Sequence, residues 1–160
     1  YEGGIREPMV IRWPGVTEPG TVCEEPVTST DFYPTMLEMA GLPLRPEQHL
    51  DGVSLVGLLE EGEAPEREAI YWHYPHYGNQ GSAPAGAIRA GDWKLVEWYE
   101  DGALELYDLA SDISEANDLA DEHPGKVKEL HALLVAWREE TGARMSTPNP
   151  GFDPEKREGR

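Results

Sequence analysis

The residues best suited to bind a ligand lie in a short aromatic segment, His73-Tyr74-Pro75-His76-Tyr77. This segment leads into residues 78–86, which are rich in glycine and carry amide and hydroxyl side chains. Imidazoles and aromatic rings beside a polar loop suit the recognition of a hydroxylated molecule such as a sugar. His73 and His76 are therefore candidate substrate-binding residues. The alternative is that one histidine caps a strand and the other is simply exposed.

A metal site is the second chemistry to consider. His73 and His76 are three residues apart, which on a strand places them on opposite faces, and no third zinc ligand is evident. A segment further along has calcium-ligand residue types: Asp108, Asp112, Glu115, Asn117, Asp118 and Asp121. It lacks the alternating ligands, the central glycine and the final bidentate Glu of an EF-hand loop. The sequence thus predicts an acidic turn between sheet and helix, and no metal-binding residue.

Arg6 is a third candidate, in the opening segment Tyr1-Glu2-Gly3-Gly4-Ile5-Arg6. The two adjacent glycines predict a backbone that turns tightly or closely approaches another group, because only glycine enters the required dihedral regions at low cost. Arg6 is then either an ion-pair anchor for this glycine loop or a substrate contact.

The charge balance excludes one class of partner. The chain has 13 Lys and Arg residues against 31 Asp and Glu residues, a formal net charge of −18, and no Lys or Arg between Lys94 and Lys126. Binding nucleic acid requires cations that neutralise phosphates and release counterions, so no nucleic-acid partner is expected. No apolar run reaches the roughly 18 residues that a membrane-spanning helix needs, so no membrane span is expected.

The first part of the chain predicts a mixture of strand and helix. Residues 8–13 are an apolar run bounded by prolines, typical of a buried strand. A helix is expected near 30–40, ending at Gly41, and a short helical turn near 54–59. Residues 61–68 are acidic and predict an exposed linker. The apolar face expected for the helix consists of residues at helical spacing: Phe32, Met36, Leu37 and Ala40.

From residue 69 the pattern changes to β-strands. Four are predicted, over 69–74, 86–90, 92–99 and 103–109, with Asp101-Gly102 as a hairpin turn between the last two. A helix is predicted between Pro124 and Gly142, with one apolar stripe: Val127, Leu130, Leu133, Leu134 and Trp137. The expected result is a small α+β subdomain, an antiparallel sheet packed by one C-terminal helix.

Motifs occur in order along nearly the whole chain. They are Tyr1-Glu2-Gly3-Gly4-Ile5-Arg6 with Pro8, Arg12-Trp13-Pro14-Gly15, Ser29-Thr30-Asp31 with Pro34-Thr35, Asp51-Gly52-Val53-Ser54, Gly91-Asp92-Trp93-Lys94-Leu95, Glu105-Leu106-Tyr107-Asp108 and Asn117-Asp118-Leu119. As a set they resemble the signature of the formylglycine-dependent sulfatases, the arylsulfatase family of the alkaline-phosphatase-like superfamily. The resemblance implies the C-terminal portion of an enzyme that is α/β as a whole.

This resemblance also implies a division of the chain. Residues 1–60 would supply one strand and one helix of the large sulfatase domain. Residues 61–68 would be an acidic linker, residues 69–142 the C-terminal α+β subdomain, and residues 143–160 an extended tail.

The chemistry of the complete enzyme is implied in the same way. Sulfatases hydrolyse sulfate esters with a Cys or Ser oxidised to formylglycine, while calcium or another divalent metal and cationic side chains hold the sulfate. The modified residue lies in a Cys/Ser-x-Pro/Ala-x-Arg motif, which the sequence after Cys23, Glu24-Glu25-Pro26-Val27, does not match. No catalytic residue and no cofactor is therefore expected within this chain, and the isolated chain is expected to be inactive.

The expected partners are the N-terminal catalytic part of the same enzyme and a sulfated small molecule or saccharide, contacted by His73, His76 and Arg6. The strand 8–13 and the helix 30–40 would lack the layers that they pack on, so the chain is expected to self-associate. The resemblance implies an extracytoplasmic location, periplasmic or secreted. Two alternatives stay open: a fragment of a related phosphodiesterase, and a stand-alone binding or structural module. An upstream Cys/Ser-x-Pro/Ala-x-Arg motif would decide between them.

Overall fold

The computed structural model describes residues 1–78, 81–147 and 149–151, and the chain divides into two compact units. One unit, here called the sheet unit, contains Tyr1–Gly3 together with the chain from Ala69 onward. The other, the helical unit, contains Gly4–Glu68. Within the described ranges, no helix is long and apolar enough to cross a membrane.

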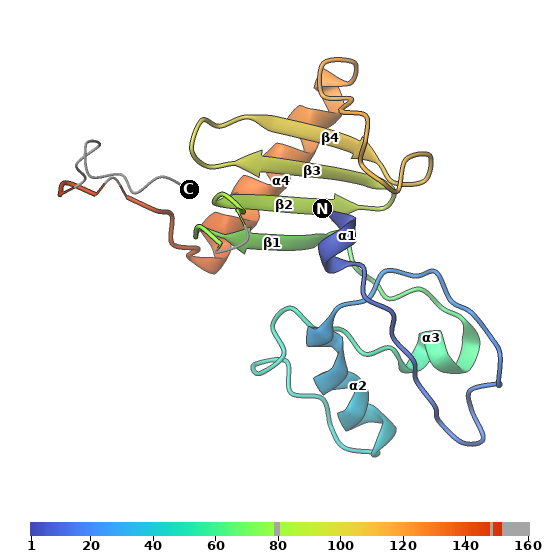
Figure 1. The fold of residues 1–160 in the computed structure, drawn as a ribbon. Coiled ribbons are helices and arrows are strands. Elements are labelled where there is room, and N and C mark those ends of the chain that lie inside the picture. Colours follow the sequence, from blue (N-terminus) through green and yellow to red (C-terminus); the bar gives the residue numbers. More distant parts are fainter. Residues whose placement is uncertain (79–80, 148, 152–160) are drawn as a thin grey trace. The chain divides into compact units, whose positions relative to one another are not determined.

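The sheet unit is built on four antiparallel strands in the order β1-β2-β3-β4 (Figure 1). Their bounds are Ile70–Tyr74 for β1, Ala85–Ala90 for β2, Trp93–Trp98 for β3 and Leu104–Asp108 for β4. The expected hairpin joins β3 to β4, where Gly102 has a φ of 74° and the Trp98 amide donates to the Ala103 carbonyl. The predicted antiparallel sheet is thereby confirmed.

One long helix, α4 (Pro124–Thr141), covers one face of this sheet, and Figure 1 shows it running across the strands. Its apolar stripe meets the alternate residues of the strands, as predicted, and Tyr71 stacks on Trp137 with ring centroids 4.9 Å apart. Burial of a Leu or Ile side chain contributes about 1.5–3 kcal/mol, so this core holds the unit together. Its fully buried members are Ile88, Leu95, Leu106, Leu130 and Leu134.

Gly86 in β2 leaves a gap that an aromatic side chain fills. A Cβ at this position would lie 2.2 Å from the Tyr99 hydroxyl oxygen and 3.1 Å from the ring carbon that carries it. The Tyr99 ring therefore occupies the space over Gly86 and reaches His73, the residue of β1 that pairs with Gly86. Any larger residue at this position would block that path.

The helical unit contains η1 (Ser29–Asp31), α2 (Phe32–Met39) and α3 (Val56–Glu61). Its centre is the fully buried carboxylate of Asp31, which accepts hydrogen bonds from the Thr28 amide (2.7 Å), the Val53 amide (3.0 Å) and the Arg67 guanidinium. The Thr35 hydroxyl extends this network, because it donates to the Asp31 carbonyl and accepts from the Leu55 amide. Asp31 and Thr35 thus hold the start of α2 to the segment before α3.

The predicted apolar face of α2 lies largely on the surface, as expected for a helix without the layer that it packs on. Phe32 is 42% exposed and Met36 59% exposed, whereas the buried residues of η1 and α2 are Asp31, Pro34 and Thr35. The physical reason is that α2 docks through the Asp31 network, and the helical unit as described has no sheet to receive an apolar stripe. The expected linker also differs in one residue, because Arg67 packs onto Asp31.

The predicted strand over 8–13 is wrong for this structure. These residues form no strand, and Val10 is 93% exposed. A strand needs a hydrogen-bonded neighbour, and the described part of the helical unit contains none.

The predicted tight turn at the two glycines is also wrong. Gly3 and Gly4 lie in the short helix α1 (Glu2–Ile5) without a positive φ. A Cβ on either glycine would meet no atom within 4 Å, so neither closely approaches another group.

Gly86→Ala should destabilise the chain by about 1–3 kcal/mol, because the added methyl group collides with the Tyr99 ring. Urea unfolding measures the loss. The matched control is Gly125→Ala in α4, where a Cβ meets nothing within 4 Å and Ala should be neutral or slightly stabilising. A Gly86→Ala variant as stable as the wild type would contradict the packing described for Tyr99.

Candidate functional site

His73 lies on β1, and both of its ring nitrogens have partners within the sheet unit. Nδ1 lies 2.7 Å from the Tyr99 hydroxyl, and Nε2 lies 3.0 Å from the Arg144 carbonyl oxygen. A carbonyl oxygen only accepts, so Nε2 carries a proton and donates to Arg144, and in a neutral imidazole Nδ1 accepts from the Tyr99 hydroxyl. His73 thereby ties β1 to the segment that follows α4.

A chain of polar side chains continues from Tyr99 along the end of α4. The Arg138 guanidinium lies over the Tyr99 ring, 5.4 Å from its centroid, and pairs with the Glu97 carboxylate at 2.7 Å. His131 approaches the same carboxylate at 3.4 Å. Burial raises the pKa of Tyr99, so its hydroxyl stays protonated and able to donate to His73. These contacts give His73 a structural function, and its contact with substrate stays a prediction.

His76 follows β1 and is exposed, beside two exposed tyrosines. Its ring meets Tyr74 edge to face, with centroids 5.5 Å apart and an interplanar angle of 81°. The Tyr77 hydroxyl donates to Glu100 at 2.6 Å. An exposed imidazole and two phenol rings can stack on a sugar ring, and their polar atoms can form hydrogen bonds with its hydroxyl groups. Asn79 and Gln80 of the predicted polar loop lie outside the described residues.

Arg6 belongs to the helical unit, whereas both histidines belong to the sheet unit. The Arg6 side chain is exposed. Of the three candidate substrate-binding residues, His73 and His76 thus lie together at the end of β1, within one unit.

A buried charge cluster that the sequence patterns did not predict lies on the sheet face opposite α4. Lys94 is only 1% exposed, and its Nζ lies 3.0 Å from Glu2 Oε1 and 2.8 Å from Glu115 Oε1. The Arg89 guanidinium lies 3.5 Å from the other Glu2 oxygen, and the Glu2 amide donates to the Glu115 carboxylate. The signal in the sequence was a lysine inside an apolar strand, since a buried lysine must have a charged partner.

Tyr1 docks beside this cluster. Its hydroxyl donates to Glu105 at 2.7 Å, and Tyr107 donates to the same carboxylate oxygen at 3.1 Å. The Tyr1 ring packs against Tyr107 and Trp98, with centroids 6.1 and 6.2 Å away. Burial, with the hydrogen bond to Glu105 and its negative charge adding, raises the pKa of Tyr1 to about 12.

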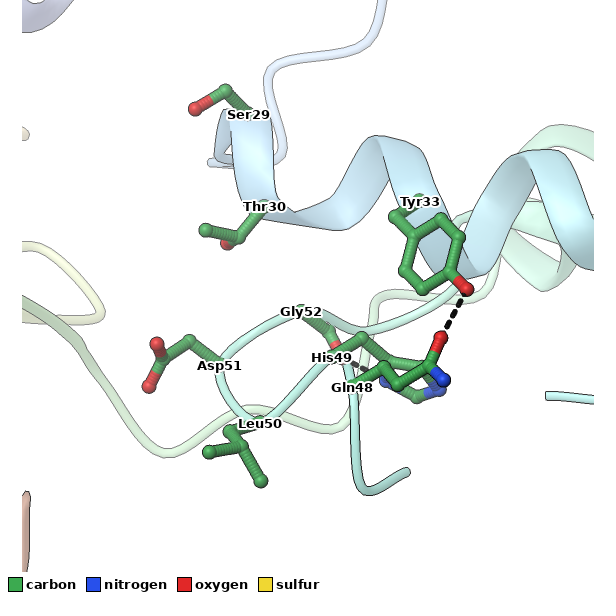
Figure 2. Close-up of a pocket in the computed structure, with 8 residues that line it drawn as sticks. All are labelled: Ser29, Thr30, Tyr33, Gln48, His49, Leu50, Asp51 and Gly52. Carbon is green, nitrogen blue, oxygen red and sulfur yellow. Dashed lines mark hydrogen bonds between the residues drawn. The ribbon is translucent and has the colours of Figure 1, made fainter. Parts of the chain in front are cut away.

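The helical unit has a shallow pocket of about 240 Å³ between the start of α2 and residues 48–52 (Figure 2). Most of its polar groups bond to the chain itself. Tyr33 donates to Gln48 at 2.5 Å, and the His49 ring accepts from the Arg45 amide and donates to the Gly52 carbonyl. These bonds brace the loop, and the exposed Leu50 lies at the pocket wall. The pocket offers few unused polar groups to a ligand.

The residues present do not fit a formylglycine or its metal. Cys23 is exposed and lacks the motif that oxidation requires. Among the residues that the structure describes, no three His, Cys, Asp or Glu side chains are arranged to hold a metal ion. In the acidic turn, Asp112 accepts from Ser114 and from the Ala116 and Asn117 amides, and these hydrogen bonds lower the pKa of its carboxyl.

Residues 1–140 match the family described as N-sulphoglucosamine sulphohydrolase, C-terminal. The chain belongs to the sulfatase family. It is 37% identical over 152 residues to a sulfatase of Formosa agariphila, and the aligned part covers 86% of the chain and 28% of that protein. It is 34% identical over 157 residues to the N-acetylglucosamine-6-O-sulfatase of Bacteroides thetaiotaomicron, and the aligned part covers 94% of the chain and 27% of that protein. The chain thus spans little more than a quarter of these relatives.

The structural comparison agrees. The sulfatase chain resembles BT4656 in complex with its substrate D-glucosamine-2-N,6-O-disulfate, with a TM-score of 0.61 and 32% sequence identity. The match covers 80% of the chain and 25% of that protein.

The sulfatase motifs of the sequence meet in the charge cluster. Tyr1-Glu2 from the first motif contacts Lys94 from the β3 motif and Glu105 and Tyr107 from the β4 motif. Residues that identify the family are thus joined by buried ion pairs and hydrogen bonds across more than 90 positions of sequence.

The Tyr1 phenol should titrate near pH 12, because burial and Glu105 disfavour the phenolate. The difference in ultraviolet absorbance between the wild type and Tyr1→Phe isolates this titration. The native state favours the protonated phenol, so its contribution to stability is complete below the ordinary pKa of about 10 and is lost as the pH rises towards 12. Glu105→Gln should lower the pKa of Tyr1, and the control Glu129→Gln in α4 should not. A Tyr1 titration near pH 10 would contradict the docked position.

Proposed function

We propose that the complete protein is a sulfuric ester hydrolase that removes sulfate from a saccharide. The match of residues 1–140 to a sulphohydrolase C-terminal region carries this proposal. The similarity to a solved structure that holds a glucosamine disulfate supports a sugar as the organic half of the ester. Formylglycine and calcium, or another divalent metal, belong to the catalytic part of the complete enzyme, since the residues of this chain do not fit them.

The chain would contribute a wall of the substrate pocket. His76 with Tyr74 and Tyr77 supplies exposed rings and a hydrogen-bonding imidazole, the side-chain types that recognise a saccharide. His73 would act at the same wall by fixing β1, and Arg6 stays a candidate substrate contact. An extracytoplasmic location is part of the same proposal and rests on the resemblance alone.

The partner of the helical unit would be the catalytic part of the same enzyme. Large apolar side chains of this unit are exposed, and such surfaces on soluble proteins mark interaction sites. They include Val10, Val22, Met36, Leu42 and Leu50. Without the catalytic part, these side chains favour self-association.

Assay of the complete gene product tests the function. Desulfation of glucosamine 6-sulfate and of a small aryl sulfate is expected, with formylglycine detected by mass spectrometry at an upstream Cys or Ser. The 160-residue chain alone should show no turnover, and Cys23→Ala should change nothing. Hydrolysis of phosphodiesters without sulfatase activity would instead indicate the related phosphodiesterase. A complete product with no hydrolase activity would favour a binding or structural module.

In the complete enzyme, His76→Ala should reduce kcat/KM for the saccharide ester and spare the small aryl sulfate. A lost hydrogen bond costs on the order of 1 kcal/mol, or a few kcal/mol if a buried partner is left unsatisfied, which is roughly fivefold to a hundredfold in rate. His73→Ala should in addition lower the melting temperature, because it removes the bonds to Tyr99 and Arg144. Equal losses of kcat/KM on both substrates for His76→Ala would contradict the proposed contact between His76 and the saccharide.

The 160-residue chain should associate with increasing concentration, as measured by sedimentation velocity. Met36→Lys and Val10→Lys should weaken this association because they place a charge on the exposed apolar surface of the helical unit. The control is Ile113→Lys, an exposed apolar position of the sheet unit. A wild-type chain that stays monomeric at high concentration would contradict the prediction.

A further inference from the structure

The charge cluster on the outer face of the sheet pairs opposite charges. Two cations, Lys94 and Arg89, face two carboxylates, Glu2 and Glu115. Lys94 and both carboxylates are almost completely buried. Removing one member of such a cluster leaves an uncompensated charge without water, so each member depends on the others.

Only one member comes from outside the chain segment that forms the sheet. Glu2 lies in Tyr1–Gly3, the sole part of the first 68 residues that belongs to the sheet unit. Polar contacts fasten this segment: the Glu2 carboxylate to Lys94 and Arg89, the Glu2 amide to Glu115, and the Tyr1 hydroxyl to Glu105. The chain then passes at Gly4 into the helical unit. The cluster therefore sits where the chain leaves one unit for the other.

The backbone of Glu115 shows that the surroundings impose this geometry. Its φ is 54°, the left-handed region, and among the described residues it is the one non-glycine with a positive φ. A side chain other than glycine persists in this region where surrounding contacts over-determine it. The Glu115 contacts to Lys94 and to the Glu2 amide supply that constraint.

We propose that Lys94 and Glu115 are positioning residues that lock Tyr1–Gly3 onto the sheet. Because the lock requires a carboxylate at position 2, it holds the segment at one place along the strands, which an apolar contact would not do. The consequence for catalysis rests on the proposed function: the catalytic part of the enzyme is held to this subdomain through the locked segment. A displacement of about 1 Å remote from the chemistry can cost roughly a hundredfold in rate.

Amide exchange in the 160-residue chain, followed by NMR, tests the lock itself. Glu2→Ala removes the segment's carboxylate and leaves the Lys94–Glu115 pair intact, so the sheet should remain folded. The amide of residue 2 should exchange at least tenfold faster, while the Trp98 amide in the β3–β4 hairpin keeps its wild-type rate. Lys94→Met should also release the segment, and Lys126→Met, at an exposed ion pair of α4, should not. An unchanged exchange rate at residue 2 in Glu2→Ala would overturn the lock.

Kinetics of the complete enzyme test the consequence. Glu2→Ala and Lys94→Met should each lower kcat on a small aryl sulfate at least tenfold, with a smaller change in KM. The double variant Lys94→Met with Glu115→Gln removes one charge of each sign and should recover part of the kcat lost in Lys94→Met. Faster amide exchange at residue 2 together with an unchanged kcat would overturn the positioning function. A wild-type enzyme without sulfatase turnover would overturn the proposed function, and the exchange result would still decide the lock.

Discussion

A lysine ammonium that is buried in a protein must be neutralised, and this constraint organises the sheet unit. Lys94 lies on the sheet face opposite α4, beside the apolar cluster of Val96, Tyr107 and Leu109, and its charge is neutralised by Glu2 and Glu115. These carboxylates come from the start of the chain and from the turn before α4. Losing one partner of such a buried pair typically costs about 3–5 kcal/mol, so these ion pairs hold the three segments together.

The helical unit depends on a single buried charge in a comparable way. Asp31 gathers the Thr28 and Val53 amides and the Arg67 guanidinium, and it fixes α2 through polar contacts. The apolar stripe of α2 is consequently left on the surface. In both units, residues of the family motifs thus position the backbone: Asp31, Thr35, Glu2 and Lys94. Their buried polar contacts give each of them a structural function that requires no contact with substrate.

Local patterns were sufficient to predict the sheet and its helix. The alternation in β1 to β4, the Asp101-Gly102 turn and the stripe of α4 each express contacts within the sheet unit. The strand over 8–13 could not be predicted correctly, because an apolar run specifies burial without specifying the partner that provides it. That partner is not among the described residues of the helical unit.

The candidate site shows the same difference between contacts that are local in sequence and contacts that are not. Exposure of His76 beside aromatic rings follows from its neighbours in sequence, whereas the second partner of His73 is the Arg144 carbonyl, 71 residues away. Lys94 stands out in the sequence as a lysine inside an apolar strand, but its carboxylates lie 92 and 21 positions away. Periodicity carries no information on such pairings.

The rate at which the Lys94 ammonium protons exchange with water tests directly whether this group is buried and ion-paired. In a ¹⁵N-labelled chain at neutral pH, its protons should exchange slowly enough with water to give a resolved NMR signal, with couplings across hydrogen bonds to the carboxyl carbons of Glu2 and Glu115. Exposed lysines such as Lys126 should give no comparable signal. A Lys94 ammonium that exchanges as fast as Lys126, without these couplings, would contradict the buried charge cluster and the lock built on it.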